Sequence, residues 1–528
     1  MSNKPPLRRE EGTEFEEEDQ DKEDAELLED QEEGLEDGEG VGSARCRGRG
    51  SVGERFTLYS PEEERKVLKR LDWRLVAFMA LLYMMSFLDR SNIGNARIAG
   101  LESDLQLTSS QYDWLLTAFY ATYIMFEWMV LLYRLIPAHI HISLCILSWG
   151  VIASLQSVVT SYRILLVLRA LLGIGEAAFG PGLPFYLSFF FRRDELAYRT
   201  GLFISAAPLA TSFASSLAWL ITKFSEGGPI APWRLLFLVE GFPSVLVAAF
   251  AWGYIPDSPE TARFLTKRER KVAALRMQDE RETEAEVEAE AAMSEKMGIG
   301  RRQSRLSLPE IRRTLVDPKS YLTALMFFNC NVAFSSLPVF LPTIINDMGH
   351  SPVTSQLLSA FPSLLAFPIL LISAHLSDRS ASRSPYLVFT SLLGFLGYTI
   401  LALSSPSVLA LPSWLRYVAI FPATAGFFSS ITLIISWNLN NQASATGKGA
   451  GLALLNIVGQ CGPLLGTRLY PKKDAPYYTT GMTVCASCMA AVAILALGLR
   501  LVLRIQNEKR KKTSPYDGDG KAEFLYIL

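Results

Sequence analysis

Four ionisable residues lie in stretches of sequence that are otherwise apolar. Asp89 and Arg90 fall in the first such stretch, and Arg169 and Glu176 fall in the fourth. A charge in the middle of a bilayer costs at least about 2.5–3.5 kcal/mol on insertion scales, so it needs a partner or a water-filled cavity. These four positions are therefore the first candidates for a functional site.

The two residue types suit two different tasks. A carboxyl group in an apolar interior holds a proton more tightly than one in water, so Asp89 and Glu176 are candidates to carry a proton between the two sides of a membrane. An arginine such as Arg169 stays charged and can bind a carboxylate substrate through two parallel hydrogen bonds. The alternative is that Asp89–Arg90 and Arg169–Glu176 are ion pairs that only fix helix contacts.

Helix geometry places these side chains at comparable depth. If the first stretch runs outward and the fourth inward, a rise of about 1.5 Å per residue puts Asp89 about 24 Å along its helix and Arg169 about 9 Å below the outer end of its own. In a hydrocarbon core about 30 Å thick, both lie in the outer half. Glu176 follows Arg169 by seven residues, two turns deeper on the same helix face.

The composition is that of a polytopic membrane protein. Of the 528 residues, 49% are hydrophobic and 20% are charged, and the mean hydropathy is +0.20. Residues 1–40 hold 18 acidic and four basic residues, although the net charge of the whole chain is only −2. This composition disfavours a soluble enzyme, a nucleic-acid-binding protein and a secreted disulfide scaffold.

Twelve apolar windows have the length of about 20 residues that crosses a hydrocarbon core. They cover 73–96, 112–133, 140–160, 163–191, 200–223, 234–255, 321–345, 354–376, 385–405, 414–437, 448–469 and 480–504. We therefore expect an all-α membrane protein with twelve transmembrane helices in two six-helix bundles. Basic residues beside the windows favour a cytosolic location for both termini and for the central linker. The expected organisation is a disordered acidic tail over 1–60, bundles over 61–255 and 321–505, a linker over 256–320 and a cytosolic tail over 506–528.

Further polar side chains could face a cavity between the bundles. Tyr120 and Tyr123 each carry a hydroxyl that needs a partner when buried, and a substrate carboxylate or amide would serve. Asn329 and Asn438 are amides within apolar runs, as are Asn331 and Asn456, and of these we favour the first two as substrate ligands. Hydrogen bonding between helices is the alternative for all of them. No sequence motif indicates a metal, a cofactor or a catalytic triad.

Several motifs in order resemble those of a known family. They are the run Ser86–Ala96 (SFLDRSNIGNA), Arg169–Ala177 (RALLGIGEA), Gly180–Gly182, Ile255–Glu260 (IPDSPE), Ser377–Arg379, Trp437–Asn441 (WNLNN), Asn456–Gly459 and Ala475–Tyr478. Together they resemble the major facilitator superfamily, its anion:cation symporter branch and, more narrowly, the fungal allantoate and nicotinate permeases. The resemblance covers about residues 60–505.

The resemblance implies proton-coupled transport of organic anions by alternating access. It gives roles in substrate binding to Arg90 and Arg169 and in proton coupling to Asp89 and Glu176. It also suggests that Asp378 and Arg379 form a gate latch between spans eight and nine, with an ordinary basic turn as the alternative.

The expected function is uptake of a small organic anion together with protons, with a vitamin carboxylate such as nicotinate or a ureide such as allantoate as substrate. The alternative is export of a metabolite or drug by proton antiport. The fifth span, 201–224, has Pro208 but lacks the Gly-Pro-rich motif usual in drug antiporters, which favours uptake. We expect a monomer in the plasma membrane that has no nucleic-acid partner.

Overall fold

The structure is a computed structural model that describes residues 59–225, 228–278, 312, 314–380, 382–405, 408–442, 445–513 and 526–527. The acidic tail predicted over 1–60 lies outside the described residues except for Tyr59 and Ser60. The predicted linker over 256–320 is described at 256–278 and again from 314, and the predicted tail over 506–528 is described to 513 and at 526–527.

The first helix is long and passes through two irregular turns. It extends from α3 to α5, with π-helical turns η1 and η2 on either side of α4 and a kink at Gly100. Gly100 in η2 has a φ of +106°, a backbone conformation that glycine adopts without steric cost. The segments are α3 (Pro61–Leu71), η1 (Asp72–Val76), α4 (Ala77–Ala96), η2 (Arg97–Leu101) and α5 (Glu102–Asp104).

The rest of the first half is also helical. Thr108 begins α6 with a capping box, in which its hydroxyl accepts from the Gln111 backbone and the Gln111 side chain accepts from the Thr108 backbone, so orphan donors at the helix start are satisfied. The elements are α6 (Ser109–Phe126), η3 (Glu127–Arg134), α7 (Ala138–Leu155), η4 (Gln156–Val158), α8 (Tyr162–Ala177), α9 (Phe179–Leu187), α10 (Arg193–Ile204), α11 (Ala206–Phe224) and α12 (Pro232–Tyr254).

The second half begins where Asp317 caps α15 and Pro318 occupies the first helical position, where a proline loses no hydrogen bond. Proline also lies inside three of its helices, α15, α16 and α18, where it removes a backbone donor from the helix. The elements are α15 (Pro318–Asp347), α16 (Pro352–Arg379), α17 (Ser384–Ala402), α18 (Ser413–Asn440), α19 (Ala445–Gly459), α20 (Gly462–Gly466) and α21 (Thr479–Thr513).

The all-helical membrane fold predicted from the sequence is confirmed. In the described ranges no strand occurs, and eleven helices are long and apolar enough to cross a membrane. The second predicted span, 112–133, corresponds to α6 and η3 and is not one of the eleven. Its composition is more polar because much of α6, including Tyr112, Tyr120 and Tyr123, faces other helices rather than lipid.

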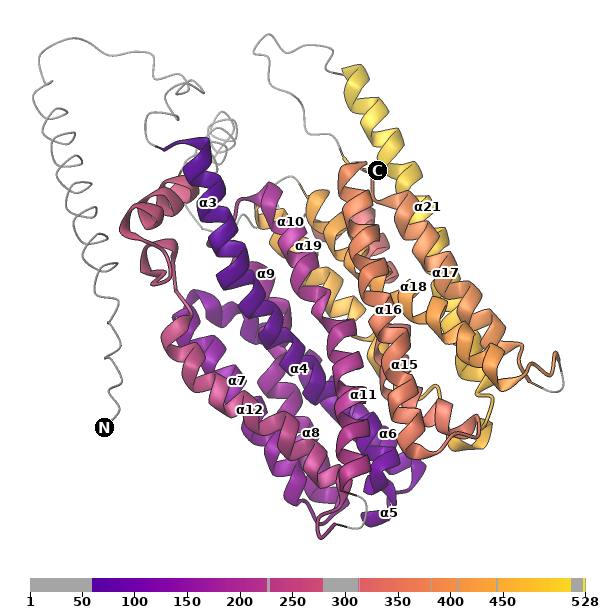
Figure 1. The fold of residues 1–528 in the computed structure, drawn as a ribbon. Helices are drawn as coiled ribbons and strands as arrows, with labels where there is room; N and C mark the ends of the chain where they lie inside the picture. The colour runs from indigo at the N-terminus through magenta and orange to yellow at the C-terminus, as the bar shows by residue number, and fades with distance from the viewer. Residues whose placement is uncertain are drawn as a thin grey trace, which may run out of the picture. The chain divides into compact units, whose positions relative to one another are not determined.

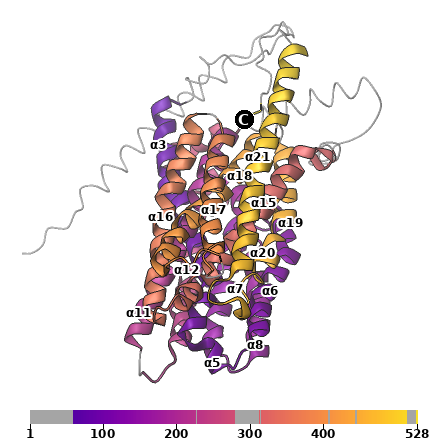
Figure 2. The same cartoon turned by 90° about the vertical axis from the view of Figure 1, so that its right-hand side faces the viewer.

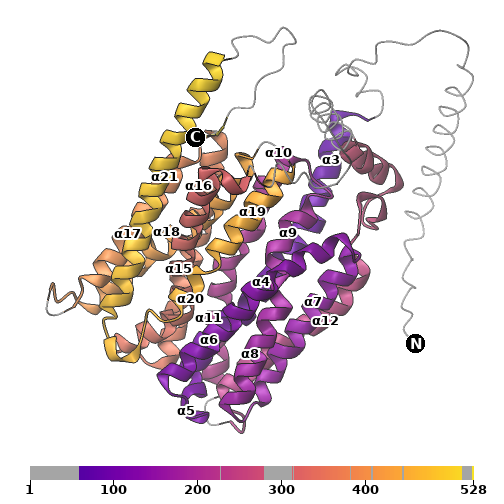
Figure 3. The ribbon, with the colours of Figure 1, turned by 180° about the vertical axis from the view of Figure 1, so that it is seen from behind.

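The helices pack as two halves that meet along a shared face. In the first half α7 lies against α12 and α6 against α8, and in the second half α17 lies against α18 and α21 (Figures 1 and 3). Helices α4 and α15 meet across the halves, as do α11 and α16. The beginning of α3 and the end of α21 lie on the same side of the bundle, at the top of Figures 1 and 2. We call this the terminal side.

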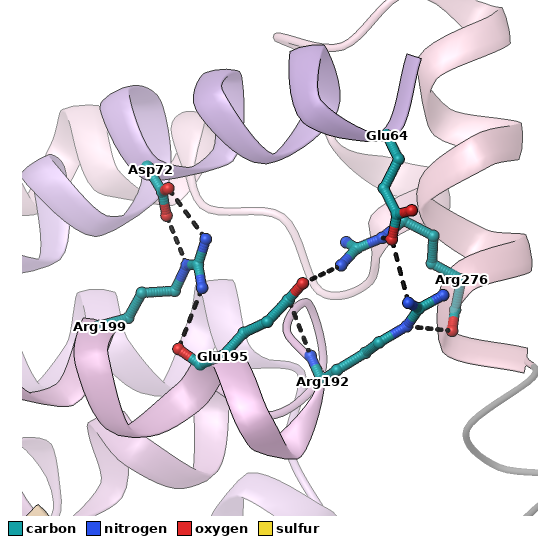
Figure 4. A network of polar contacts seen from close by, with 6 residues as sticks. All are labelled: Glu64, Asp72, Arg192, Glu195, Arg199 and Arg276. Carbon is teal, nitrogen blue, oxygen red and sulfur yellow. Dashed lines mark hydrogen bonds and ion pairs between the residues drawn. The ribbon is translucent and has the colours of Figure 1, made fainter. Parts of the chain in front are cut away.

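An ion-pair network ties the described part of the linker to the first half on the terminal side (Figure 4). Arg276, whose side chain is fully buried, donates to Glu64 at 2.7 Å and to Glu195 at 2.6 Å. Arg199 donates from two nitrogens to the two carboxylate oxygens of Asp72. A helix over residues 267–278 is thereby held against α3 and α10.

Candidate functional site

Arg90 of α4 and Glu176 of α8 form a buried ion pair. Nη2 and Nε of Arg90 lie 2.9 and 3.2 Å from Oε2 of Glu176, and the Ser86 hydroxyl donates to the same oxygen at 3.0 Å. The other carboxylate oxygen, Oε1, is buried and has no hydrogen-bond partner. One oxygen of Glu176 therefore accepts hydrogen bonds from Arg90 and Ser86, and the other accepts none.

Aromatic rings surround the Arg90 guanidinium. Its central carbon lies 4.9 Å from the ring centre of Tyr123 and 5.2 Å from that of Phe119. Such contacts attract a cation through the negative face of the ring. The geometry fixes the guanidinium at the wall of a cavity.

This cavity lies between the two halves. Its empty volume is about 720 Å³, including open solvent at its mouth. The first half lines it with Tyr83, Arg90, Tyr120, Tyr123, Gly180, Pro181, Pro184, Phe203 and Ile204, and the second half with Phe327, Asn331, Phe334, Ser335, Ile431, Ile435, Leu452, Asn456, Gln460 and Pro463.

On the side away from the termini, the halves are joined by contacts beyond the cavity. Lys472 of the second half pairs with Glu102 at 2.7 Å, and Glu102 also accepts from Arg97 at 3.1 Å. The ring of Phe340 lies against Tyr112, with ring centres 6.1 Å apart. These contacts hold the two halves together on the side opposite the termini.

Asp89 and Arg169 lie outside the cavity lining, in the packed interior of the first half. Asp89 accepts a long hydrogen bond, 3.4 Å, from Ser244 of α12. Arg169 is 1% exposed and lies 5.5 Å from the ring centre of Phe237, while its Nε and Nη2 have no hydrogen-bond partner. Of the four predicted ionisable residues, only Arg90 therefore lines the cavity, and it binds the buried Glu176, whereas Asp89 and Arg169 are enclosed nearby.

The other predicted site residues fall in several places. Tyr120 and Tyr123 line the cavity. Asn329 donates to a carbonyl of its own helix, and Asn438 accepts from Thr323 at 3.3 Å, so neither lines the cavity. Their proposed role in substrate binding stays a prediction.

The predicted latch lies at the terminal-side end of α16. There Asp378 forms an ion pair with Arg383 in the following turn of the same half, and Arg379 is exposed. In this arrangement Asp378 is thus held locally, and its gating role also stays a prediction.

Glu240 and Gln460 were not among the residues predicted from the sequence, and Asn331 and Asn456 were named there without being favoured. Glu240 of α12 is buried, and neither carboxylate oxygen has a partner. It lies one turn from Ser244, which contacts Asp89. The cavity amides are Asn331, Asn456 and Gln460 rather than the two asparagines that we favoured. Glu240 could have been identified because it is a carboxylate within the apolar window 234–255. Helix periodicity alone does not show that Asn331 rather than Asn329 faces the cavity.

A cavity between two helical halves, lined by both, defines a membrane transporter. The chain belongs to the Major Facilitator Superfamily, whose profile matches residues 79–467. The family resemblance drawn from the motifs is thereby confirmed, and the similar proteins of known class are transporters rather than enzymes.

Relatives and solved structures extend the comparison. The chain is 30% identical to the MFS transporter prlL of Fungal sp. (strain NRRL 50135) over 461 residues, which is 85% of this chain and 88% of that protein. It is 27% identical to the high-affinity nicotinic acid transporter of Saccharomyces cerevisiae over 479 residues, 88% of this chain and 85% of the other. A solved structure of the proton:xylose symporter XylE shares the fold, with a TM-score of 0.58 and 15% identity over 80% of this chain and 94% of that one.

Proposed function

We propose that this protein is a proton-coupled symporter that takes up a small organic anion. The observation that carries the proposal is the Arg90–Glu176 pair at the cavity wall, with Oε1 of Glu176 unpartnered. It joins the one cavity-lining arginine of the described residues to a carboxylate that can change its charge.

The pair gives a physical reason for coupling. An anion that enters the cavity competes with Glu176 for the Arg90 guanidinium. Removing one partner of a buried ion pair costs about 3–5 kcal/mol because the other charge is left unpaired. Protonation of Glu176 removes that penalty, since Arg90 then needs a new anion and the substrate supplies it. Anion and proton therefore bind together, and the loaded site has the same net charge as the empty one.

The lining supports a flat aromatic or amide-bearing carboxylate. Aromatic side chains from both halves, Tyr120 and Phe334 among them, offer ring faces, and Asn331, Asn456 and Gln460 offer donors and acceptors. Arg90 would hold the carboxylate through two hydrogen bonds. A relative is named as a nicotinic acid transporter, and nicotinate, a carboxylate on a nitrogen-containing ring, has this chemistry.

We assign Arg169 a role in anion binding at a later stage of the transport cycle. Its two unpartnered nitrogens are enclosed in this arrangement, and a buried unsatisfied donor is costly. An anion that reaches Arg169 when the opposite side opens would satisfy these donors. Asp89 and Glu240, buried close to one another on α4 and α12, would then adjust the charge around it by holding or releasing a proton.

We place the terminal side in the cytosol, and the protein in the plasma membrane as the family resemblance suggests. The described residues of the network on that side include Arg192, Arg199 and Arg276, with Arg268 and Arg270 nearby in the linker helix. Basic residues beside membrane spans concentrate on the cytosolic side. Uptake by symport and export by antiport are distinguished by the direction of the proton gradient that drives accumulation.

The test is uptake of radiolabelled carboxylates, with nicotinate among them, into a transport-deficient yeast with and without a protonophore. We expect one or more carboxylates to accumulate only while the inward proton gradient persists. Accumulation driven by an outward gradient would identify an antiporter, and no transport of any carboxylate would refute the anion assignment.

The variant Glu176→Gln separates coupling from binding. The amide keeps the shape of the protonated acid, so we expect loss of gradient-driven accumulation with retained substrate exchange between preloaded vesicles. Glu127→Gln is the matched control, because Glu127 is also a buried carboxylate but neither of its oxygens has a hydrogen-bond partner. Accumulation by Glu176→Gln under a proton gradient would show that Glu176 is not the coupling residue.

A further inference from the structure

The side chains of Asn441 and Asn507 bind the backbone of the dipeptide Tyr526–Ile527. Asn441 is far from this dipeptide in the sequence. Asn441 donates to the carbonyl of Ile527 at 3.1 Å and accepts from the amide of Ile527 at 2.8 Å. Asn507 makes the same pair of bonds with Tyr526, both at 2.9 Å. Each asparagine thus engages the N–H and C=O of one residue, as a neighbouring strand would in a sheet.

A third side chain adds to this recognition. The indole N–H of Trp437, one of the largest fully buried side chains, donates to the carbonyl of Ile527 at 2.8 Å. That carbonyl therefore accepts two hydrogen bonds, from Trp437 and Asn441. All four backbone polar groups of the dipeptide are satisfied by side chains.

The side chain of Tyr526 is bound separately, by two cations. The ammonium of Lys319 lies 3.8 Å from the ring centre, and Arg510 donates to the hydroxyl at 2.8 Å. Cations are attracted to the negative face of an aromatic ring. The site therefore binds the backbone of the dipeptide through two asparagine side chains and the tyrosine side chain through two cations.

The binding residues come from three helices of the second half. Lys319 lies in the first turn of α15, Trp437 in the last turn of α18 with Asn441 just beyond it, and Asn507 and Arg510 near the end of α21. Ile431 and Ile435, earlier in α18, line the cavity. The occupied site thus connects the terminal-side end of a cavity helix to two neighbours.

We propose that Trp437, Asn441 and Asn507 form a dock for an extended peptide, that Tyr526–Ile527 is its ligand within this chain, and that docking holds the terminal-side end of α18 in place. Residues 514–525 join the ligand to α21. A short tether of this kind provides an effective concentration on the order of millimolar, so a dock of modest intrinsic affinity stays occupied.

Hydrogen–deuterium exchange on the full chain in lipid nanodiscs tests the dock without knowledge of the transported substrate. The amides of Tyr526 and Ile527 are both hydrogen-bonded, so we expect them to exchange at least tenfold more slowly than in a free peptide of residues 521–528. Asn441→Ala and Asn507→Ala should each abolish this protection. Asn346→Ala, at the far end of α15, is the control and should leave it unchanged.

A variant without residues 526–528 tests the effect on α18. We expect faster exchange over 437–441, with protection restored when the synthetic peptide of residues 521–528 is added at millimolar concentration. Exchange of Tyr526 and Ile527 at the free-peptide rate in the intact protein would overturn the dock. Unchanged exchange over 437–441 after the deletion would overturn the claim that the ligand holds α18.

Discussion

Gly94 of α4 lies so close to α15 that any larger residue should push the two halves apart. A Cβ atom built on Gly94 would lie 2.0 Å from the carbonyl oxygen of Val339 and 2.9 Å from its carbonyl carbon. Both are backbone atoms, so no side-chain rotation relieves the clash. Gly94 is four residues beyond Arg90, on the side of the cavity opposite the termini, and the contact joins the two halves.

The size of the effect follows from the geometry. Ordinary Cβ contacts begin at 3.4 Å, so Gly94→Ala requires α4 and α15 to separate by more than 1 Å at this point. Overpacking of a well-packed interface typically costs about 1–3 kcal/mol. A state in which the opposite side opens avoids that cost, so the equilibrium between the two access states should shift by about 5- to 150-fold toward it.

Side-specific alkylation measures that shift. A single cysteine at Ser335, which lines the cavity, is labelled with a membrane-impermeant maleimide from either side of vesicles, in a background without the native cysteines. We expect Gly94→Ala to lower the ratio of terminal-side to opposite-side labelling by at least fivefold. Gly253→Ala is the control, since nothing lies within 4 Å of a Cβ at that position.

An unchanged labelling ratio in Gly94→Ala would refute the reasoning, because the close contact would then not belong to one access state. A thermal unfolding curve in detergent accompanies the assay. If opening relieves the clash, the unfolding temperature should stay near that of Gly253→Ala. A large drop with no change in labelling would mean that the contact supports the fold in both states.

Two further predictions follow from the buried arginines. Arg276→Gln leaves Glu195 without this cation and Glu64 with Arg192 alone. Each hydrogen bond lost to a charged group contributes about 1.5–3 kcal/mol, so trypsin should cleave the helix over 267–278 at least tenfold faster, whereas Arg263→Gln, an exposed change, should leave the rate unaltered. Arg169→Lys loses the planar fork that binds a carboxylate, and we expect at least a tenfold weaker anion affinity measured from the opposite side. Equal affinity would return Arg169 to a structural role.

The helices and their order could be predicted because a membrane span needs about 20 apolar residues and no water is present to satisfy a broken backbone. The predicted windows 73–96 and 414–437 fall within the first helix and α18. The weakest agreement is at α6, whose polar residues face the interior. Burial among other helices removes the need for an apolar surface, so composition alone understates such a span.

The ion pairing could not be read from the sequence in the same way. Asp89 and Arg90 are adjacent, and successive residues of a helix point about 100° apart, so they meet different neighbours. Arg90 faces α8 and the cavity, whereas Asp89 faces Ser244 of α12. Motifs identified which residues matter, but the partners depend on how the helices are rotated against one another, and that is set by packing.

The location of the charged residues gives a reason why a substrate would be needed to switch the protein between its two access states. In the proposed mechanism the Arg90–Glu176 pair accepts the proton. This pair belongs wholly to the first half, on α4 and α8, while the cavity amides Asn331, Asn456 and Gln460 belong to the second. Protonation of Glu176 alone would not create a contact between the Arg90–Glu176 pair and these amides of the second half. An anion held by Arg90 on one side and by the amides on the other connects the halves, because it makes contacts with both. Differential binding of this bridging ligand to the two access states can shift their populations, so the proposed symport would place the coupling in the occupied cavity rather than in either half.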